Sequence, residues 1–161
     1  MKYKKLLLST VISLFIFTGN SFTAGTSSED NVSKYEKLYK KGALLIKQGK
    51  KLEKKDKTEK AKKKYLRAIK YLEQSNQIEP RKPDTLNYLG FALRKTGNFE
   101  DAEKFYLEGL KIDPKHVGIN EYLGELYIAT NRLDKAKERL KILETCNCEE
   151  YSELKNLINQ N

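Results

Sequence analysis

Two cysteines and a single histidine are the side chains of this sequence best suited to nucleophilic or metal chemistry. Cys146 and Cys148 flank one residue, and His116 follows Pro114-Lys115 in what reads as a turn. A nucleophilic triad needs a histidine aligned with a nucleophile and a carboxylate, and no motif of that kind surrounds His116. We therefore expect His116 to be solvated, and we expect no catalytic residue and no enzymatic activity.

The cysteine pair has three interpretations. Thiols in an oxidising compartment usually pair, but a disulfide that spans one residue closes a cramped ring and is easily reduced. Such a bond would lock the turn before the C-terminal helix. The alternatives are reduced structural thiols and a reactive or soft-metal pair. Two thiolates cannot complete a tetrahedral zinc shell by themselves, so we expect no metal site and no cofactor.

The acidic residues and glycines also lack the spacing of a catalytic or phosphate-binding site. Glu100, Asp101 and Glu103 fall in the first turn of an expected helix, where carboxylates favour the positive end of the helix dipole. A phosphate-binding loop needs several glycines between a strand and a helix, and no segment reads as a strand. These residues are therefore expected to be structural.

The N-terminus has the three-part layout of a secretory signal. Three lysines, Lys2, Lys4 and Lys5, precede an apolar run over residues 6–17, and small and polar residues follow it. A membrane anchor is the alternative, but about 12 apolar residues fall short of the roughly 20 that span a bilayer. The sequence therefore predicts secretion across the inner membrane and a periplasmic protein.

The predicted signal peptide covers residues 1–24. Cleavage is expected after Ser21, Ala24 or Gly25, and residues 25–33 are expected to form a flexible mature N-terminus.

Positive charge is concentrated in one part of the chain. The whole sequence has a formal net charge of +10. Residues 34–82 contain 18 Lys or Arg against 6 Asp or Glu, whereas residues 83–161 contain 11 against 14. The chain is thus predicted to consist of a basic arm and a nearly neutral body.

The basic arm suggests an anionic partner. Nucleic acid is the usual inference, but secretion separates the protein from most of it, and only Arg67 and Arg81 offer the bidentate donors that base recognition favours. An anionic membrane surface or an acidic envelope protein is the better candidate, since lysines gain about 1 kcal/mol each near an anionic surface. The alternative is a solvated face. The expected basic surface comprises Lys54, Lys55, Lys57, Lys60, Lys62, Lys63 and Lys64.

The elements that carry these residues repeat with a period of 34 residues. Shifting the chain by this step aligns Tyr88 with Tyr122, Leu89 with Leu123, Gly90 with Gly124, Thr96 with Thr130 and Ala102 with Ala136. The same step backwards aligns Phe99 with Tyr65, Ala102 with Ala68 and Pro114 with Pro80. Such a period is typical of helical solenoids.

The central unit resembles the tetratricopeptide repeat family. Its pattern has a Leu-Gly pair, an alanine, an aromatic residue and a closing proline, which here are Leu89-Gly90, Ala102, Tyr106 and Pro114. The resemblance implies an all-α fold, namely a short right-handed superhelical solenoid of three helix hairpins and a C-terminal capping helix. The segment LETCNCEEYSELKNLI is also similar to small periplasmic members of this family from alphaproteobacteria, which implies a structural role for the cysteines.

Helices are expected over residues 31–54, 58–78, 83–96, 99–112, 117–130 and 133–145. The corresponding units are 34–80, 83–116 and 117–148, and residues 149–161 form the cap. The first unit departs from the pattern by an insertion, Lys50–Lys63, which consists of good helix formers. We therefore expect both of its helices to be longer, with a break near Asp56–Thr58, where Asp56 or Thr58 caps the second helix.

Stacked hairpins of this family form a concave groove, lined by the first helix of each pair, so the resemblance implies an adaptor that binds a protein or peptide. Phe91 is expected to be exposed there as a hydrophobic anchor. Glu121 and Glu125 argue against a C-terminal carboxylate as the ligand. The expected groove residues are Asn87, Phe91, Arg94, Lys95, Glu121, Glu125 and Ile128.

Two other functions stay open. One is docking through the basic surface, and the other is a thiol or soft-metal role of Cys146 and Cys148. Self-association also stays open, because such repeats can stack between chains.

Overall fold

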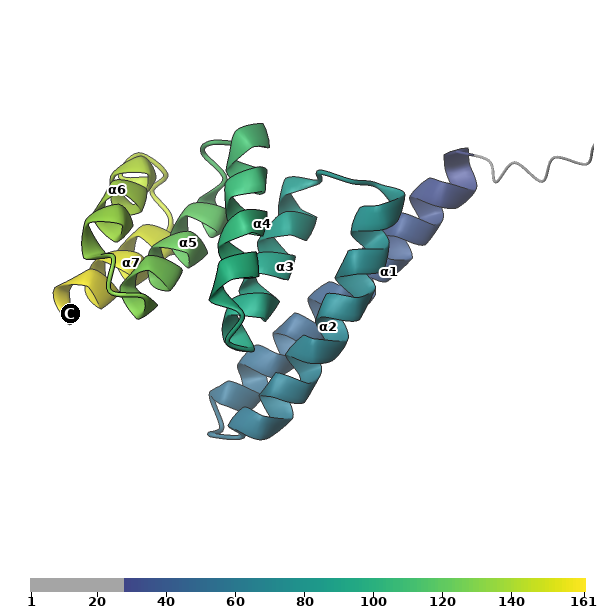
Figure 1. The fold of residues 1–161 in the computed structure, drawn as a ribbon, viewed down its shortest axis with the longest axis horizontal. Helices are drawn as coiled ribbons and strands as arrows, with labels where there is room; N and C mark the ends of the chain where they lie inside the picture. The colour runs from purple at the N-terminus through teal and green to yellow at the C-terminus, as the bar shows by residue number, and fades with distance from the viewer. Residues whose placement is uncertain (1–27) are drawn as a thin grey trace, which may run out of the picture.

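The computed structural model describes residues 28–161, which form seven α-helices and no strand (Figure 1). The predicted all-α fold is therefore confirmed. The predicted signal peptide, its cleavage sites and residues 25–27 lie outside the described residues. The helices are α1 (Ser28–Glu53), α2 (Thr58–Ile78), α3 (Pro83–Lys95), α4 (Phe99–Ile112), α5 (Val117–Ala129), α6 (Leu133–Leu143) and α7 (Glu149–Asn159).

The first six helices form three hairpins that stack in chain order. Helix α1 packs on α2, α3 on α4 and α5 on α6, while α7 packs against α5 and α6 at the end of the stack (Figure 1). Contacts also join α1 to α3 and α3 to α5. The first helices of the three pairs therefore share one face of the solenoid. Within residues 28–161, no helix combines the length and the apolar character that crossing a membrane requires.

The close approach of α3 and α4 depends on Gly90. A Cβ atom at this position would lie 2.5 Å from Cε1 of Tyr106, whose side chain is fully buried. At the end of α3, Gly97 adopts a φ of 90°, in the left-handed region that favours glycine. Asn98 then caps α4 by accepting a hydrogen bond from the N–H of Asp101. The sequence thus specifies both the spacing and the turn of this hairpin.

Helix α7 completes the core of the last pair. Leu154 and Ile158 are buried, and Leu154 fills the space that the missing side chain of Gly124 leaves on α5. Terminal repeats need such a cap because one apolar face has no following repeat to cover it.

The first hairpin is longer than the others, with 26 residues in α1 and 21 in α2 against 13 and 14 in α3 and α4. Its turn differs from the expected one. Asp56 has a φ of 55° and reverses the chain, and Lys57 occupies the N-cap of α2 without a side-chain hydrogen bond. The prediction that Asp56 or Thr58 caps α2 is therefore wrong.

Of the segment 25–33, residues 28–33 belong to a helix, because α1 begins at Ser28. Glu29 and Asp30 lie in the first turn of α1. Carboxylates there interact favourably with the positive end of the helix dipole, which favours an early start of the helix.

Candidate ligand-binding groove

Three of the seven expected groove residues are buried, and the other four are half-buried. Phe91 is only 2% exposed, Glu121 3% and Asn87 8%. The prediction of an exposed Phe91 is therefore wrong, because an aromatic ring with so little accessible surface cannot serve as a contact for a partner.

The burial of Phe91 results from helices outside its own hairpin. Its ring centroid lies 5.6 Å from that of Tyr65 on α2 and 4.8 Å from that of Tyr122 on α5. The Lys50 ammonium, near the end of the lengthened α1, lies 5.4 Å from the same ring. Aromatic pairs and cation–π contacts of this kind stabilise the junction of the repeats.

Other expected groove residues join the repeats to one another. Arg94 on α3 forms an ion pair with Glu125 on α5 at 2.8 Å, and the Arg94 side chain is only 8% exposed. Lys95 pairs with Glu53 of α1 at 2.9 Å. Ile128 is half-buried and packs against the core of the last repeats. These side chains are therefore occupied by contacts within the protein.

An open groove lies beside Tyr88 and Tyr122, the residues that directly follow the expected groove residues Asn87 and Glu121. We call it the α1–α3–α5 groove, and its volume is about 350 Å³. One wall consists of residues from α1 and of Lys54, which directly follows this helix, and the other of one tyrosine each from α3 and α5. The lining residues are Ala43, Ile46, Lys47, Lys50, Lys51, Lys54, Tyr88 and Tyr122.

Contacts with neighbouring side chains hold the two tyrosine rings in place. Tyr122 rests on Phe91, and its hydroxyl accepts a hydrogen bond from Lys50 Nζ at 3.2 Å. Tyr88 packs against Tyr39 of α1, with ring centroids 5.8 Å apart. Burial raises the pKa of the Tyr122 hydroxyl, so this group stays neutral at physiological pH. The groove thus offers rigid, amphipathic rings beside a row of cations.

One sequence signal could have identified these tyrosines. Tyr88 and Tyr122 occupy the same position in successive 34-residue units. An aromatic residue that recurs at a half-exposed position of neighbouring repeats forms a continuous strip on the shared face. The lysines of α1 carry no such signal, because only the packing of α1 against α3 brings them to the same groove.

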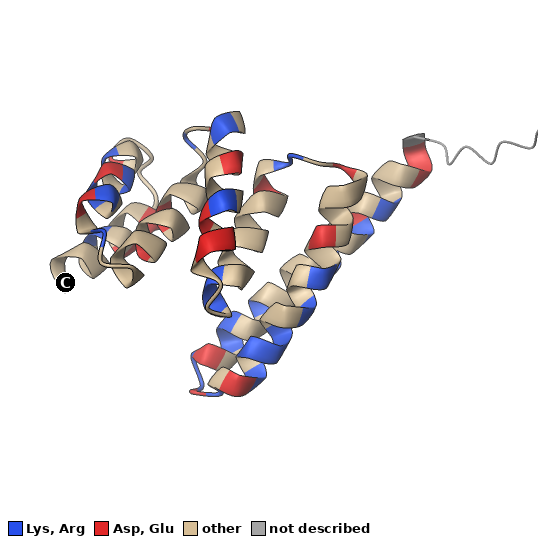
Figure 2. Ribbon diagram, viewed as in Figure 1, with Lys and Arg blue, Asp and Glu red and all other residues tan. Residues whose placement is uncertain are grey.

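The expected basic surface lies at the far end of the first hairpin. Six of its seven lysines are exposed, and Lys64 is half-buried. Figure 2 shows this end of α1 and α2 as the largest concentration of basic residues on the ribbon. Lys54 belongs both to this surface and to the groove.

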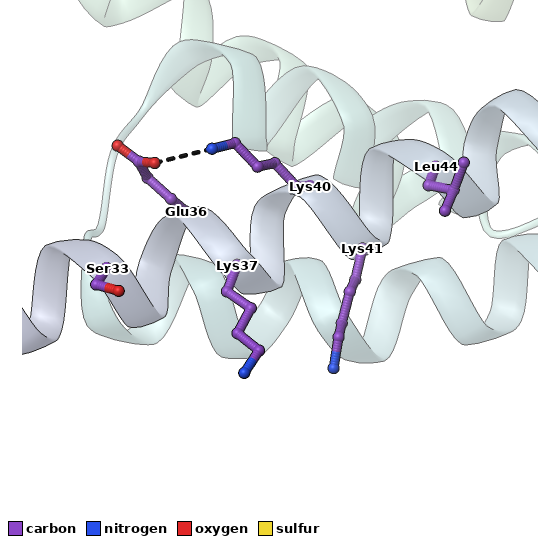
Figure 3. Close-up of a pocket in the computed structure, with 6 residues that line it drawn as sticks. All are labelled: Ser33, Glu36, Lys37, Lys40, Lys41 and Leu44. Carbon is purple, nitrogen blue, oxygen red and sulfur yellow. Dashed lines mark hydrogen bonds and ion pairs between the residues drawn. The ribbon is translucent and has the colours of Figure 1, made fainter.

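A second hollow, of about 460 Å³, runs along the outside of α1 (Figure 3). All six residues that line it come from this one helix, and the Lys40 ammonium pairs with the Glu36 carboxylate at 3.0 Å. Lys37 and Lys41 extend away from the helix in Figure 3. Without a second wall this surface cannot enclose a ligand, and we do not assign it as the site.

Known proteins share this architecture. The tetratricopeptide repeat family model matches residues 83–116. The type III secretion chaperone SycD of Yersinia enterocolitica, solved in complex with a peptide of the translocator YopD, is similar with a TM-score of 0.61 at 18% identity, covering 80% of this chain and 88% of that one. Residues 83–116 of this chain form a tetratricopeptide repeat.

Two further structures resemble this repeat protein. The first repeat domain of Spaghetti (RPAP3), bound to the HSP90 peptide SRMEEVD, gives a TM-score of 0.55 at 21% identity and covers 75% of this chain and 92% of that one. The Sgt2 domain from Aspergillus fumigatus gives 0.56 at 20%, covering 74% and 77%. No curated protein sequence matches the repeat protein. At these identities the likeness establishes the fold alone.

His116 has a structural role in the repeat protein. Its Nδ1 accepts a hydrogen bond from the N–H of Ile119 at 3.2 Å and so caps α5, and its Nε2 lies 3.2 Å from Asp84 Oδ1 on α3. The side chain is 15% exposed. The expectation of a solvated histidine is therefore wrong, because it joins two successive repeats.

Cys146 and Cys148 are bonded to each other in the turn between α6 and α7. The structure thus has the first of the three states considered for this pair. Among residues 28–161, no group of three or more His, Cys, Asp or Glu side chains is arranged to hold a metal ion.

Glu121 makes the stability of the repeat protein depend on pH. Burial raises the pKa of its carboxyl to about 9, and a hydrogen bond to Glu153 and the charge of Glu125 contribute. The folded pKa lies above the ordinary 4.5, so the native state holds a proton that the unfolded state releases. The stabilising effect of that proton is complete below about pH 4.5 and is lost as the pH rises to about 9.

We expect Glu121→Gln to remove this dependence. Thermal or urea unfolding between pH 4.5 and 9 should give the variant a free energy of unfolding that exceeds the wild type by on the order of 2 kcal/mol at the upper end. The two proteins should converge at the lower end. Parallel curves for the two proteins would contradict a protonated Glu121.

Proposed function

We propose that this tetratricopeptide-repeat protein is a non-enzymatic interaction scaffold that binds a segment of a partner protein in the α1–α3–α5 groove. The observation that carries the proposal is the pair Tyr88 and Tyr122, held half-exposed at equivalent positions of two repeats opposite a helix wall. Rigid aromatic rings supply contact area at low entropic cost, and they are frequent energetic centres of interfaces.

The structural neighbours support this proposal. SycD and Spaghetti (RPAP3) were each solved with a peptide bound, and both share the fold of this chain. A segment in the groove would contact three helices at once, α1, α3 and α5, and so would gain its contacts from the stacking of the repeats.

We also propose that the scaffold acts in the periplasm. The signal-like segment over residues 1–24 supports this location, and so does the disulfide between Cys146 and Cys148, because such bonds persist in oxidising compartments.

Photo-crosslinking in intact cells tests the scaffold. A photoreactive amino acid replaces Lys47 or Lys51 in the groove, Lys63 on the basic hairpin, or Lys104 on α4. We expect both groove positions to capture the same protein. The captured complex should be in the periplasmic fraction, and the chain in it should lack the predicted signal peptide, residues 1–24. Capture at Lys104 to the same extent would indicate non-specific contact and would contradict the proposal.

The captured protein is then purified and titrated. Tyr88→Ser should weaken its binding at least about tenfold, because a hot-spot ring contributes more than about 1 kcal/mol. Tyr71→Ser is the matched control, since Tyr71 is a half-buried tyrosine of α2 that lines a different hollow. Equal losses for the two variants would show that the groove is not the binding surface.

A second function is favoured by the exposed lysines at the end of the first hairpin (Figure 2). These lysines suit docking on an anionic membrane or an acidic envelope protein. Crosslinks formed at Lys63 but absent at Lys47 and Lys51 would support docking and would contradict the groove proposal.

A further inference from the structure

We propose that the α1–α3–α5 groove selects an internal acidic segment of its partner, with Asp or Glu side chains placed against the lysines that line the groove and an apolar side chain placed between Ala43 and Tyr88. This inference rests on the proposed scaffold function and adds the chemistry of the ligand.

The lysines form a single stripe. Lys47, Lys50, Lys51 and Lys54 follow one another at the spacing that puts residues on the same face of a helix. The stripe is about 10 Å long, since each residue of a helix rises about 1.5 Å. That length fits two or three acidic residues of an extended segment, whose residues rise about 3.3 Å each.

The stripe carries uncompensated charge. All four lysines are exposed, and none of them forms an ion pair within residues 28–161. The nearby carboxylate of Glu53 is already bound by Lys95 at 2.9 Å. No acidic side chain lines the groove. An acidic segment would therefore supply the missing counter-charges and would also be guided to the groove by them.

The other wall is amphipathic. Ala43 supplies aliphatic surface from α1 above the buried Ile46, and the rings of Tyr88 and Tyr122 line the groove from α3 and α5. A purely acidic segment would leave this surface uncovered. A segment with one leucine or phenylalanine among its carboxylates would match both walls.

The shape of the site favours a peptide over a membrane. The lysine stripe faces a groove bounded by α3 and α5, and a flat bilayer cannot enter a groove. The exposed lysines at the hairpin end, such as Lys60 and Lys63, do not line the groove and are open to a flat surface.

An internal segment is also a better fit than a chain terminus. No arginine lines the groove, and Arg94 of α3 is buried and paired with Glu125, so the groove lacks the bidentate donor that suits a terminal carboxylate. The ligand should therefore need its acidic side chains and not a free terminal carboxylate.

Fluorescence anisotropy tests the inference with the mature chain and labelled peptides of about twelve residues. The probe peptide has an amidated C-terminus and Glu and Asp residues around one Leu-Phe pair. Its controls are the same peptide with a free C-terminus, with Lys in place of the acids, and with Ser in place of Leu-Phe. We expect equal binding with either C-terminus and at least about tenfold weaker binding of both other peptides.

Variants of the protein separate the two lysine groups. The double change Lys47→Glu and Lys51→Glu should weaken the acidic peptide about 10- to 100-fold, and binding should fall as salt rises from 50 to about 500 mM. Lys60→Glu with Lys63→Glu changes the net charge equally on the same hairpin, and it should alter the affinity less than about threefold. Circular dichroism establishes that all variants are folded.

The outcomes distinguish the two proposals. If the partner crosslinks at Lys47 and Lys51 but the acidic and lysine peptides bind alike, the acidic preference is wrong and the scaffold stands. If nothing crosslinks in the groove and no peptide binds, both are wrong. Peptide binding that needs Lys60 and Lys63, or binding only to vesicles that contain phosphatidylglycerol, would overturn the inference in favour of hairpin docking.

Discussion

Replacing Gly90 with valine should lower the free energy of unfolding by about 3 kcal/mol. The Cβ atom of any residue at this position would lie 2.5 Å from the Tyr106 ring, and that ring is completely enclosed between the hairpins. The ring cannot move without displacing its own neighbours, since protein interiors are densely packed. Overpacking of this kind costs about 1–3 kcal/mol and the branched side chain of valine adds to it.

A second glycine provides the control for this experiment. Gly97→Ala should cost about 1 kcal/mol, because its φ of 90° disfavours a side chain but no atom lies within 4 Å of the new Cβ. Chemical denaturation of both variants measures the difference. If the two substitutions cost the same, contact with Tyr106 does not set the distance between α3 and α4. A Gly90→Val and Tyr106→Leu double variant replaces the ring with a smaller side chain and should recover part of the lost free energy of unfolding.

Removing Arg94 should also destabilise the fold, by about 3 kcal/mol for Arg94→Met. The guanidinium is almost completely buried and joins α3 to Glu125 of α5. Methionine keeps the length of the side chain but leaves the Glu125 carboxylate without its cation, and an unpaired charge in a largely buried site is costly. A residue that merely binds a ligand would instead lose affinity with little change in stability.

A double-mutant cycle measures this interaction. Arg94→Met combined with Glu125→Gln should recover at least about 1 kcal/mol, because the unpaired carboxylate is removed along with its partner. Lys40→Met is the control, since Lys40 and Glu36 form an ion pair with side chains that are 72% and 53% exposed. Such exposed pairs contribute little, so its loss should stay within about 0.5 kcal/mol. Additive effects in the cycle would refute a coupled, buried pair.

The two predictions concern residues whose roles could be predicted from the sequence to different degrees. Gly90 and Tyr106 were placed correctly, because their roles follow from a local pattern that repeats every 34 residues. Arg94 and Glu125 were assigned to a binding surface, whereas the structure pairs them across two repeats. Periodicity identifies the face of a helix that is apolar, but it does not reveal which polar residues meet a partner on another hairpin.

The groove illustrates the same limit. Its tyrosines recur at equivalent positions and were within reach of a sequence argument. Its lysines belong to a long basic stretch of the sequence, and the charge pattern by itself predicts a basic surface only at the end of the hairpin. Only the packing of α1 against α3 places Lys47, Lys50 and Lys51 in the groove. The same packing covers the Phe91 ring with Lys50.

The sequence by itself determined the helices, their breaks, the stacking of three hairpins and the need for a cap. These features depend on interactions between residues close in the chain, such as the Gly97-Asn98 turn, and on a repeat whose packing is the same in each unit. The tertiary structure alone decided which side of each helix remains open. Burial at Phe91, Arg94 and Glu121 is the sum of contacts from several hairpins, and the lengthened α1 changes that sum in a way that no local pattern contains.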